Sequence, residues 1–130
     1  MRDLAGLLEA AKKGFSNKMK EAPEFIAAVR LSRDVLRWTV ATKNDTAAWK
    51  NWEDQATAAV VSVPANIGEA SARATHRQLL QYYQVAFGSN WELLALMMCC
   101  PVEVPEELWR AANDVSRLIG ARLERLVSIQ

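Results

Sequence analysis

Apolar residues recur at helical spacing along nearly the whole chain, and no segment shows a strand pattern of convincing length. Only five glycines and four prolines interrupt this periodicity. The 130 residues are enough for one domain with a single hydrophobic core. We therefore predict an all-α protein, an antiparallel up-and-down four-helix bundle with an extra short N-terminal helix.

Capping and proline signals give the expected boundaries. Residues 1–22 are predicted to form an N-terminal amphipathic helix or arm, and residues 23–130 the four-helix bundle. The bundle helices are expected over residues 24–43, 46–72, 76–100 and from 106 onward, with a kink near Pro64 in the second. In the first bundle helix the expected apolar stripe comprises Phe25, Ile26, Val29, Leu36 and Val40.

The formal net charge is only +1, so the whole-protein charge gives no reason to expect nucleic-acid binding. The charge is uneven, however: residues 1–43 carry nine Lys and Arg against five acidic residues. Such asymmetry is suited to joining subunits or to presenting a basic rim to RNA, and a solvated face with ordinary salt bridges is the alternative. The candidate nucleic-acid or partner face comprises Arg30, Arg33, Arg37, Arg117, Arg122 and Arg125.

We expect a cytoplasmic protein without a membrane partner. The first twenty residues lack the uninterrupted apolar core of a signal peptide, and the longest apolar run, 93–101, is too short to cross a bilayer. The two cysteines, Cys99 and Cys100, are adjacent, and a disulfide between neighbours would be strained. Buried free thiols in a reducing compartment are therefore expected.

Two motifs between Val60 and Glu92 carry a family resemblance. The segments VSVPANIGEASAR and AFGSNWELL resemble the four-helix-bundle family encoded in intervening sequences of bacterial 23S ribosomal RNA genes. The matching positions are Ser62, Pro64, Ala65, Asn66, Ile67 and Glu69, followed by Ala86, Gly88, Ser89, Glu92 and Leu93. Gly68 and Ala70 depart from the family pattern, which has Ala and Gly there.

The resemblance implies a bundle that assembles into a homo-oligomeric ring, commonly a pentamer. One branch of the family comprises the accessory variability proteins of diversity-generating retroelements, which bind a reverse transcriptase and its RNA template. A non-enzymatic scaffold with such a complex as partner is the expected function. The alternative is a protein-interaction or regulatory module of the same family that binds no nucleic acid.

Polar residues of these motifs fall on two helix faces. Asn66, Glu69 and Arg73 share one face, Ser62 lies four residues before Asn66, and the next helix supplies Ser89 and Glu92. Where these faces meet we predict a structural polar layer of Ser62, Asn66, Glu69, Arg73, Ser89 and Glu92, in which Glu69 or Glu92 pairs with Arg73. A small-molecule site or a partner contact in this layer are the alternatives.

Catalytic chemistry finds little support in the sequence. His76 is the only histidine, so one subunit cannot build the paired motifs of di-iron bundles, and no phosphate-binding glycine loop occurs. We therefore expect a protein that is not an enzyme and that binds no metal and no cofactor. The five tryptophans are Trp38, Trp49, Trp52, Trp91 and Trp109. They are many for the core of a slim bundle, so we expect at least one or two of them at subunit interfaces.

Overall fold

The all-α prediction is confirmed by a computed structural model that describes residues 3–42, 44–73 and 75–129. These residues form five helices and no strand. The helices are α1 (Leu4–Met19), α2 (Pro23–Thr42), α3 (Ala47–Ala70), α4 (His76–Met98) and α5 (Glu106–Ser128).

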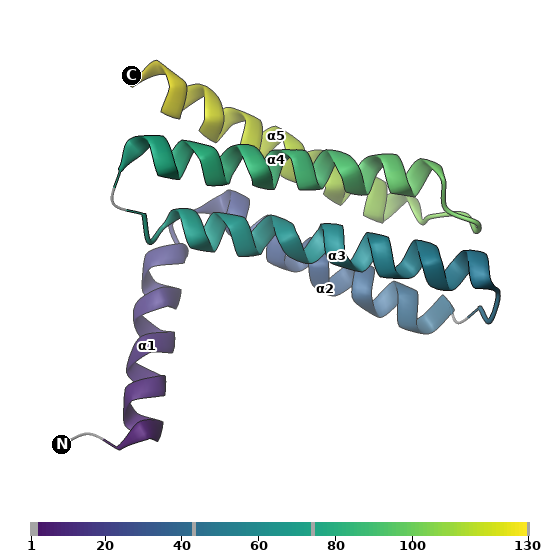
Figure 1. Cartoon of the computed structure of the whole chain (residues 1–130), viewed down its shortest axis with the longest axis horizontal. Coiled ribbons are helices and arrows are strands. Elements are labelled where there is room, and N and C mark those ends of the chain that lie inside the picture. The colour runs from purple at the N-terminus through teal and green to yellow at the C-terminus, as the bar shows by residue number, and fades with distance from the viewer. Residues whose placement is uncertain (1–2, 43, 74, 130) are drawn as a thin grey trace.

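Helices α2 to α5 form one unit, called the body below. In it α2 packs against α3 and α5, and α4 packs against the same two helices. Helix α1 stands apart and projects away from the end of the body where α2 begins (Figure 1). The centre of the body is aliphatic; the side chains exposed by no more than 1% include Leu31, Val35, Val60, Val63, Ile67, Leu93, Val115 and Ile119.

The helices begin where the capping signals predict. Thr46 caps α3 by accepting a hydrogen bond from the backbone N–H of Trp49 at 3.2 Å, and Thr75 caps α4 in the same way through Gln78. Pro23 is the first residue of α2, where its missing N–H costs nothing. The predicted C-terminal limit of that helix, Lys43, lies outside the described residues.

The predicted apolar stripe of α2 is wrong. The residues of α2 that the structure buries are Glu24, Ala28, Leu31, Ser32, Val35 and Thr39. Ile26, Leu36 and Val40 are instead exposed on the outside of the body. The larger side chains suggested the stripe, but small ones at Ala28 and Ser32 face the neighbouring helices and let them approach closely.

Helix α3 runs through Pro64 without a break. A proline removes the N–H that would bond the carbonyl four residues earlier, here that of Val60. The buried hydroxyl of Ser32 donates to this Val60 oxygen at 2.9 Å. A side chain of α2 therefore supplies the donor that Pro64 removes from α3.

Helix α1 is held to the body only near its C-terminal end. The Phe15 ring meets the Phe25 ring edge to face at 5.6 Å, and the Lys18 ammonium donates to the Ser71 carbonyl. Met19 is the single buried residue of α1. The apolar stripe of this amphipathic helix, which includes Leu4, Leu7, Leu8 and Phe15, continues past the body into solvent, where the three leucines are exposed.

Two findings bear on the compartment predictions. No helix within residues 3–42, 44–73 and 75–129 is long and apolar enough to span a membrane. Both cysteines are free thiols, but Cys99 is exposed and Cys100 only half-buried, so the expected burial is wrong for Cys99. Helix α4 ends at Met98, which places both cysteines at the turn that follows it.

Candidate functional site

A short hydrogen-bonded chain joins α3 to α4 at the predicted polar layer. The Ser62 and Ser89 hydroxyl oxygens lie 2.8 Å apart, so one donates to the other. Asn66 Nδ2 donates to the Ser62 hydroxyl at 2.9 Å and to the Ser62 carbonyl at 2.7 Å. All three side chains are half-buried, so this chain fixes the register of the two helices.

The charged members of the predicted layer lie outside this chain. Glu69, in the last turn of α3, pairs with Arg73 just beyond the end of that helix, and the Arg73 guanidinium also lies 4.8 Å from the centre of the Tyr82 ring. Glu92 is exposed on α4. Among the described residues no hydrogen bond or ion pair joins Asn66, Glu69 and Glu92 to one another, so the layer for which a small-molecule site was an alternative is not continuous.

A buried carboxylate that sequence reasoning missed connects three helices. Glu24 of α2 is 1% exposed. Its Oε1 accepts a hydrogen bond from the Tyr83 hydroxyl of α4 at 2.8 Å and from Arg122 Nε of α5 at 3.0 Å. Burial, with the hydrogen bond to Glu24, raises the pKa of Tyr83 well above its ordinary value.

The sequence did contain a signal for this network. Glu24 falls at the spacing of Ala28, Leu31 and Val35, the stripe that the structure buries. In the first turn of a helix a glutamate is also explained by the positive end of the helix dipole, so its position alone does not indicate burial. A carboxylate on a buried stripe needs a partner, and Arg122 on the last helix is that partner.

Asn90 is a second buried polar residue that the sequence analysis passed over. It is fully buried on α4, and its Nδ2 donates to the Ala112 carbonyl at 2.9 Å and to the Ser116 hydroxyl at 2.7 Å. Its Oδ1 has no hydrogen-bond partner among the described residues. Asn90 thus fixes the register of α4 on α5.

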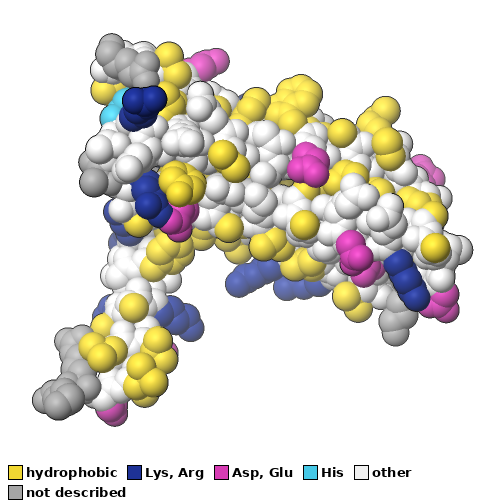
Figure 2. Space-filling model, viewed as in Figure 1, with side chains coloured by type: hydrophobic (Ala, Val, Ile, Leu, Met, Phe, Trp, Pro, Cys, Tyr) yellow, Lys and Arg dark blue, Asp and Glu magenta, His cyan; other side chains and the backbone are white. Residues whose placement is uncertain are grey.

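The six candidate arginines fall into different environments. Arg30, Arg33 and Arg37 are exposed together on the outside of α2. Arg37 pairs with Asp34 at 3.4 Å, and Arg117 lies 3.7 Å from Asp114. Arg125 is exposed, whereas Arg122 points into the Glu24 network. On the face shown in Figure 2, Lys and Arg side chains gather at the edges of the molecule.

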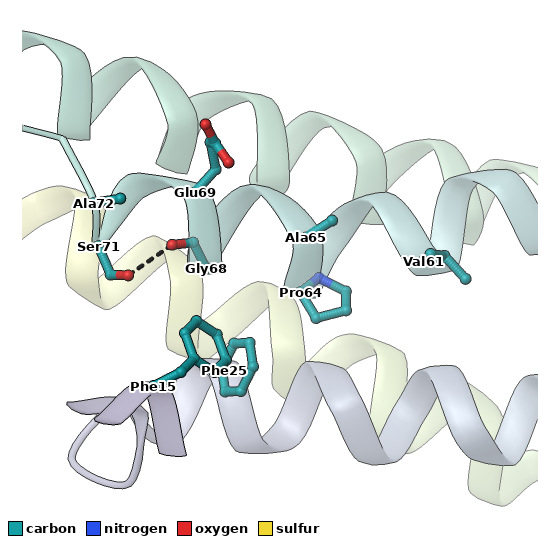
Figure 3. A pocket seen from close by; sticks show the side chains of 9 residues that line it. All are labelled: Phe15, Phe25, Val61, Pro64, Ala65, Gly68, Glu69, Ser71 and Ala72. Carbon is teal, nitrogen blue, oxygen red and sulfur yellow. Dashed lines mark hydrogen bonds between the residues drawn. The ribbon is translucent and has the colours of Figure 1, made fainter. Parts of the chain in front are cut away.

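An apolar groove lies in the angle between α1 and the body. It has a volume of about 530 Å³ and is lined by Phe15, Phe25, Val61, Pro64, Ala65, Gly68, Glu69, Ser71 and Ala72. Figure 3 shows the two phenylalanine rings beside each other, facing Gly68, while Glu69 points away from them. A Cβ at Gly68 would come within 3.3 Å of the Phe15 ring, so glycine here gives α1 room to attach.

A second apolar groove runs between α4 and α5. Its volume is about 330 Å³, and Trp91, Leu94, Met98 and Trp109 are among its lining residues. Trp91 and Met98 are 56% and 77% exposed, so much of their apolar surface faces solvent. We call this the α4–α5 groove.

The other three tryptophans pack in or against the hydrophobic core. Trp49 and Trp52 are buried and stacked with ring centres 5.2 Å apart, and Trp38 meets both edge to face. The Trp52 N–H donates to the Leu96 carbonyl at 2.6 Å. These three rings close one end of the core, as expected for core tryptophans.

The described residues hold no cluster of three or more His, Cys, Asp and Glu side chains that could bind a metal ion. Comparison with known proteins gives no match to a family model, to a curated protein or to a solved structure. The candidate surfaces are therefore the outside of α2, the free part of α1 and the α4–α5 groove.

Proposed function

We propose that the protein is a non-enzymatic, homo-oligomeric scaffold of the cytoplasm. In this proposal α2–α5 form an antiparallel up-and-down four-helix bundle, and copies of it assemble into a ring, a pentamer by the family resemblance. One observation carries the proposal: thirteen large apolar side chains of the described residues are exposed. Three of them, Leu4, Leu7 and Leu8, lie together on α1, and contiguous exposed apolar surface marks interaction sites.

The proposed partner is a reverse transcriptase with its RNA, as the resemblance implies. The outside of α2 supports this choice, because Arg30, Arg33 and Arg37 lie among the exposed side chains of Ile26, Leu36 and Val40. Arginine binds phosphate, and the apolar side chains suit a protein surface. In a ring this face is repeated, so weak contacts of each copy add.

A protein-interaction module without nucleic acid is the second candidate. The ion pairs favour it, because Arg37 and Arg117 already have acidic neighbours and Arg122 is bound to Glu24. Three of the six candidate arginines are then left without an ion pair among the described residues, and the net charge of the chain is only +1. On this reading the apolar side chains of α2 contact a protein alone.

The mass of the protein in solution tests the assembly. Light scattering coupled to size exclusion at micromolar concentration is expected to give a single multiple of the 14.5 kDa chain. A monomer at that concentration would overturn the ring. A dimer would retain self-association and rule out the pentamer.

Binding to a structured RNA over a salt series tests the partner. Affinity is expected to fall steeply as salt rises, and Arg30→Gln with Arg33→Gln is expected to reduce the salt slope by about 1–2. The matched control is Arg77→Gln with Arg110→Gln, two exposed arginines outside the proposed face. No binding even at low salt would favour the protein-interaction module.

A further inference from the structure

The free end of α1 is an apolar surface without a cover. Phe15 of its apolar stripe packs on Phe25, but Leu4, Leu7 and Leu8 of the same stripe are 71%, 51% and 61% exposed. A helix of 16 residues is marginal in water by itself, and an apolar stripe is stabilised by packing. The free part of α1 therefore needs a surface that its own body does not provide.

The α4–α5 groove is the kind of exposed surface that such an apolar stripe requires. It is a concave apolar surface between two tryptophans, and tryptophan is the residue that most often anchors protein interfaces. Helix α1 leaves the end of the body where α4 begins, whereas Trp91 and Met98 lie in the last third of α4 (Figure 1). The stripe and the groove of one chain are thus at opposite ends of it.

The charges around the two surfaces are complementary. Helix α1 carries three lysines, at positions 12, 13 and 18, against Glu9 as its single acidic residue. Residues 89–117, which contain the whole groove and the partner of Asp114, carry five acidic residues against two basic ones, Arg110 and Arg117. A basic apolar helix therefore fits an apolar groove in an acidic segment, and long-range attraction favours this pairing over one between two α1 helices.

We propose that α1 of one copy binds the α4–α5 groove of the next, with Leu4, Leu7 and Leu8 against Trp91 and Met98. The contact joins two different surfaces, so each copy can both give and receive a helix, and repetition closes a ring when the rotation allows it. This inference rests on the proposed self-association and names the surfaces that produce it.

Two variants, each made in the full chain, separate the surfaces. Leu4→Glu with Leu7→Glu and Leu8→Glu removes the stripe while keeping good helix formers, and Trp91→Glu with Met98→Glu removes the apolar groove wall. Each variant alone is expected to be a monomer whose body remains folded. Mixed at equal concentration they are expected to form a 1:1 dimer, because one intact stripe then meets one intact groove.

A control changes the other side of α1 and leaves its three lysines in place. Ala10→Gln with Asn17→Gln alters exposed residues off the stripe without changing the charge of α1, and the oligomer mass of the wild type is expected to persist. Circular dichroism of every variant reports whether the body is folded.

The outcomes distinguish this inference from the proposed function. If the wild type forms an oligomer and either variant keeps its mass, the α1 contact is wrong and the scaffold stands. A groove variant that dimerises alone would show pairing between two α1 helices, and a mixture that stays monomeric would also exclude the exchange. A monomeric wild type removes the proposed self-association and this contact with it. Binding of that monomer to anionic phospholipid vesicles would assign α1 to a membrane surface instead.

Discussion

At the scale of single residues, the bond between Ser32 and the Val60 carbonyl explains how α3 tolerates a proline in its interior. Pro64 has no N–H for that carbonyl, and an unpaired buried carbonyl costs about 1–3 kcal/mol. Ser32 donates to it from a neighbouring helix at 2.9 Å. A local defect in one helix is thus repaired by the packing of another.

This arrangement predicts a coupling between the two positions. Ser32→Ala is expected to lower the free energy of unfolding by about 1–3 kcal/mol, because the Val60 carbonyl loses its donor. In a Pro64→Ala background the same change is expected to cost less, since the backbone N–H at position 64 is restored. Urea unfolding of the four proteins measures both losses, and equal losses in the two backgrounds would contradict the explanation.

Tyr83 makes a prediction about pH. Burial first, and then Glu24, raise the pKa of Tyr83 above its ordinary value of 10.0. The unfolded tyrosine ionises near that value while the folded one stays protonated, so this stabilising contribution is complete below pH 10 and is lost as pH rises beyond it. Wild type is expected to lose up to about 1.4 kcal/mol per pH unit more than Tyr83→Phe there.

Denaturant unfolding at several pH values from neutral to alkaline measures this difference. At neutral pH Tyr83→Phe is expected to be less stable by about 1–3 kcal/mol, because Glu24 loses a donor. Parallel profiles of the two proteins above pH 10 would show that Tyr83 does not hold its proton in the folded state.

How far the sequence predicts these residues depends on whether a motif or a local pattern marks them. Ser62, Asn66 and Ser89 were found because they belong to the two motifs and share helix faces, and Thr46 and Thr75 because capping is local. Glu24 and Ser32 were missed because no motif contains them and their partners lie on other helices. Spacing alone does not reveal such partners.

At the scale of elements, α2 shows how helix phase escapes sequence reasoning. The periodicity predicted the helix, but two apolar stripes are present on it. The buried stripe combines Leu31 and Val35 with the small residues Ala28 and Ser32. It faces the body because the small residues let the neighbouring helices approach closely. The outside of α2 therefore combines arginines with apolar side chains, which a search for charge alone does not anticipate.

Two glycines of neighbouring helices are predicted to respond differently to alanine. A Cβ at Gly88 meets nothing within 4 Å, so Gly88→Ala is expected to stabilise α4 by about 0.5–1 kcal/mol. At Gly68 the Cβ comes within 3.3 Å of the Phe15 ring, so Gly68→Ala is expected to displace α1. Unfolding gives the first effect, and amide exchange along α1 gives the second.

The contrast between the two glycines is the informative result. Faster exchange across α1 in Gly68→Ala, with no change in Gly88→Ala, supports the attachment of α1 through Phe15. Equal exchange rates in the two variants would mean that Phe15 does not hold the helix.

At the scale of the whole molecule, an assembly makes stability depend on concentration. Binding between folded copies stabilises the folded state by mass action, so Tm is expected to rise with protein concentration. Differential scanning calorimetry over a hundredfold range of concentration measures this, with the α1 stripe variant as the control that is expected to show no dependence. A constant Tm for the wild type would contradict self-association.

The bond between Glu24 and Arg122 has a consequence for how the chain is made. It joins positions 98 apart, the first turn of α2 and the last two turns of α5. During synthesis Glu24 leaves the ribosome long before Arg122, so the nascent chain has no cation for a carboxylate that the finished body buries. We expect the body to close only after the final helix emerges. Chains that stop before α5 are then expected to remain open to proteolysis.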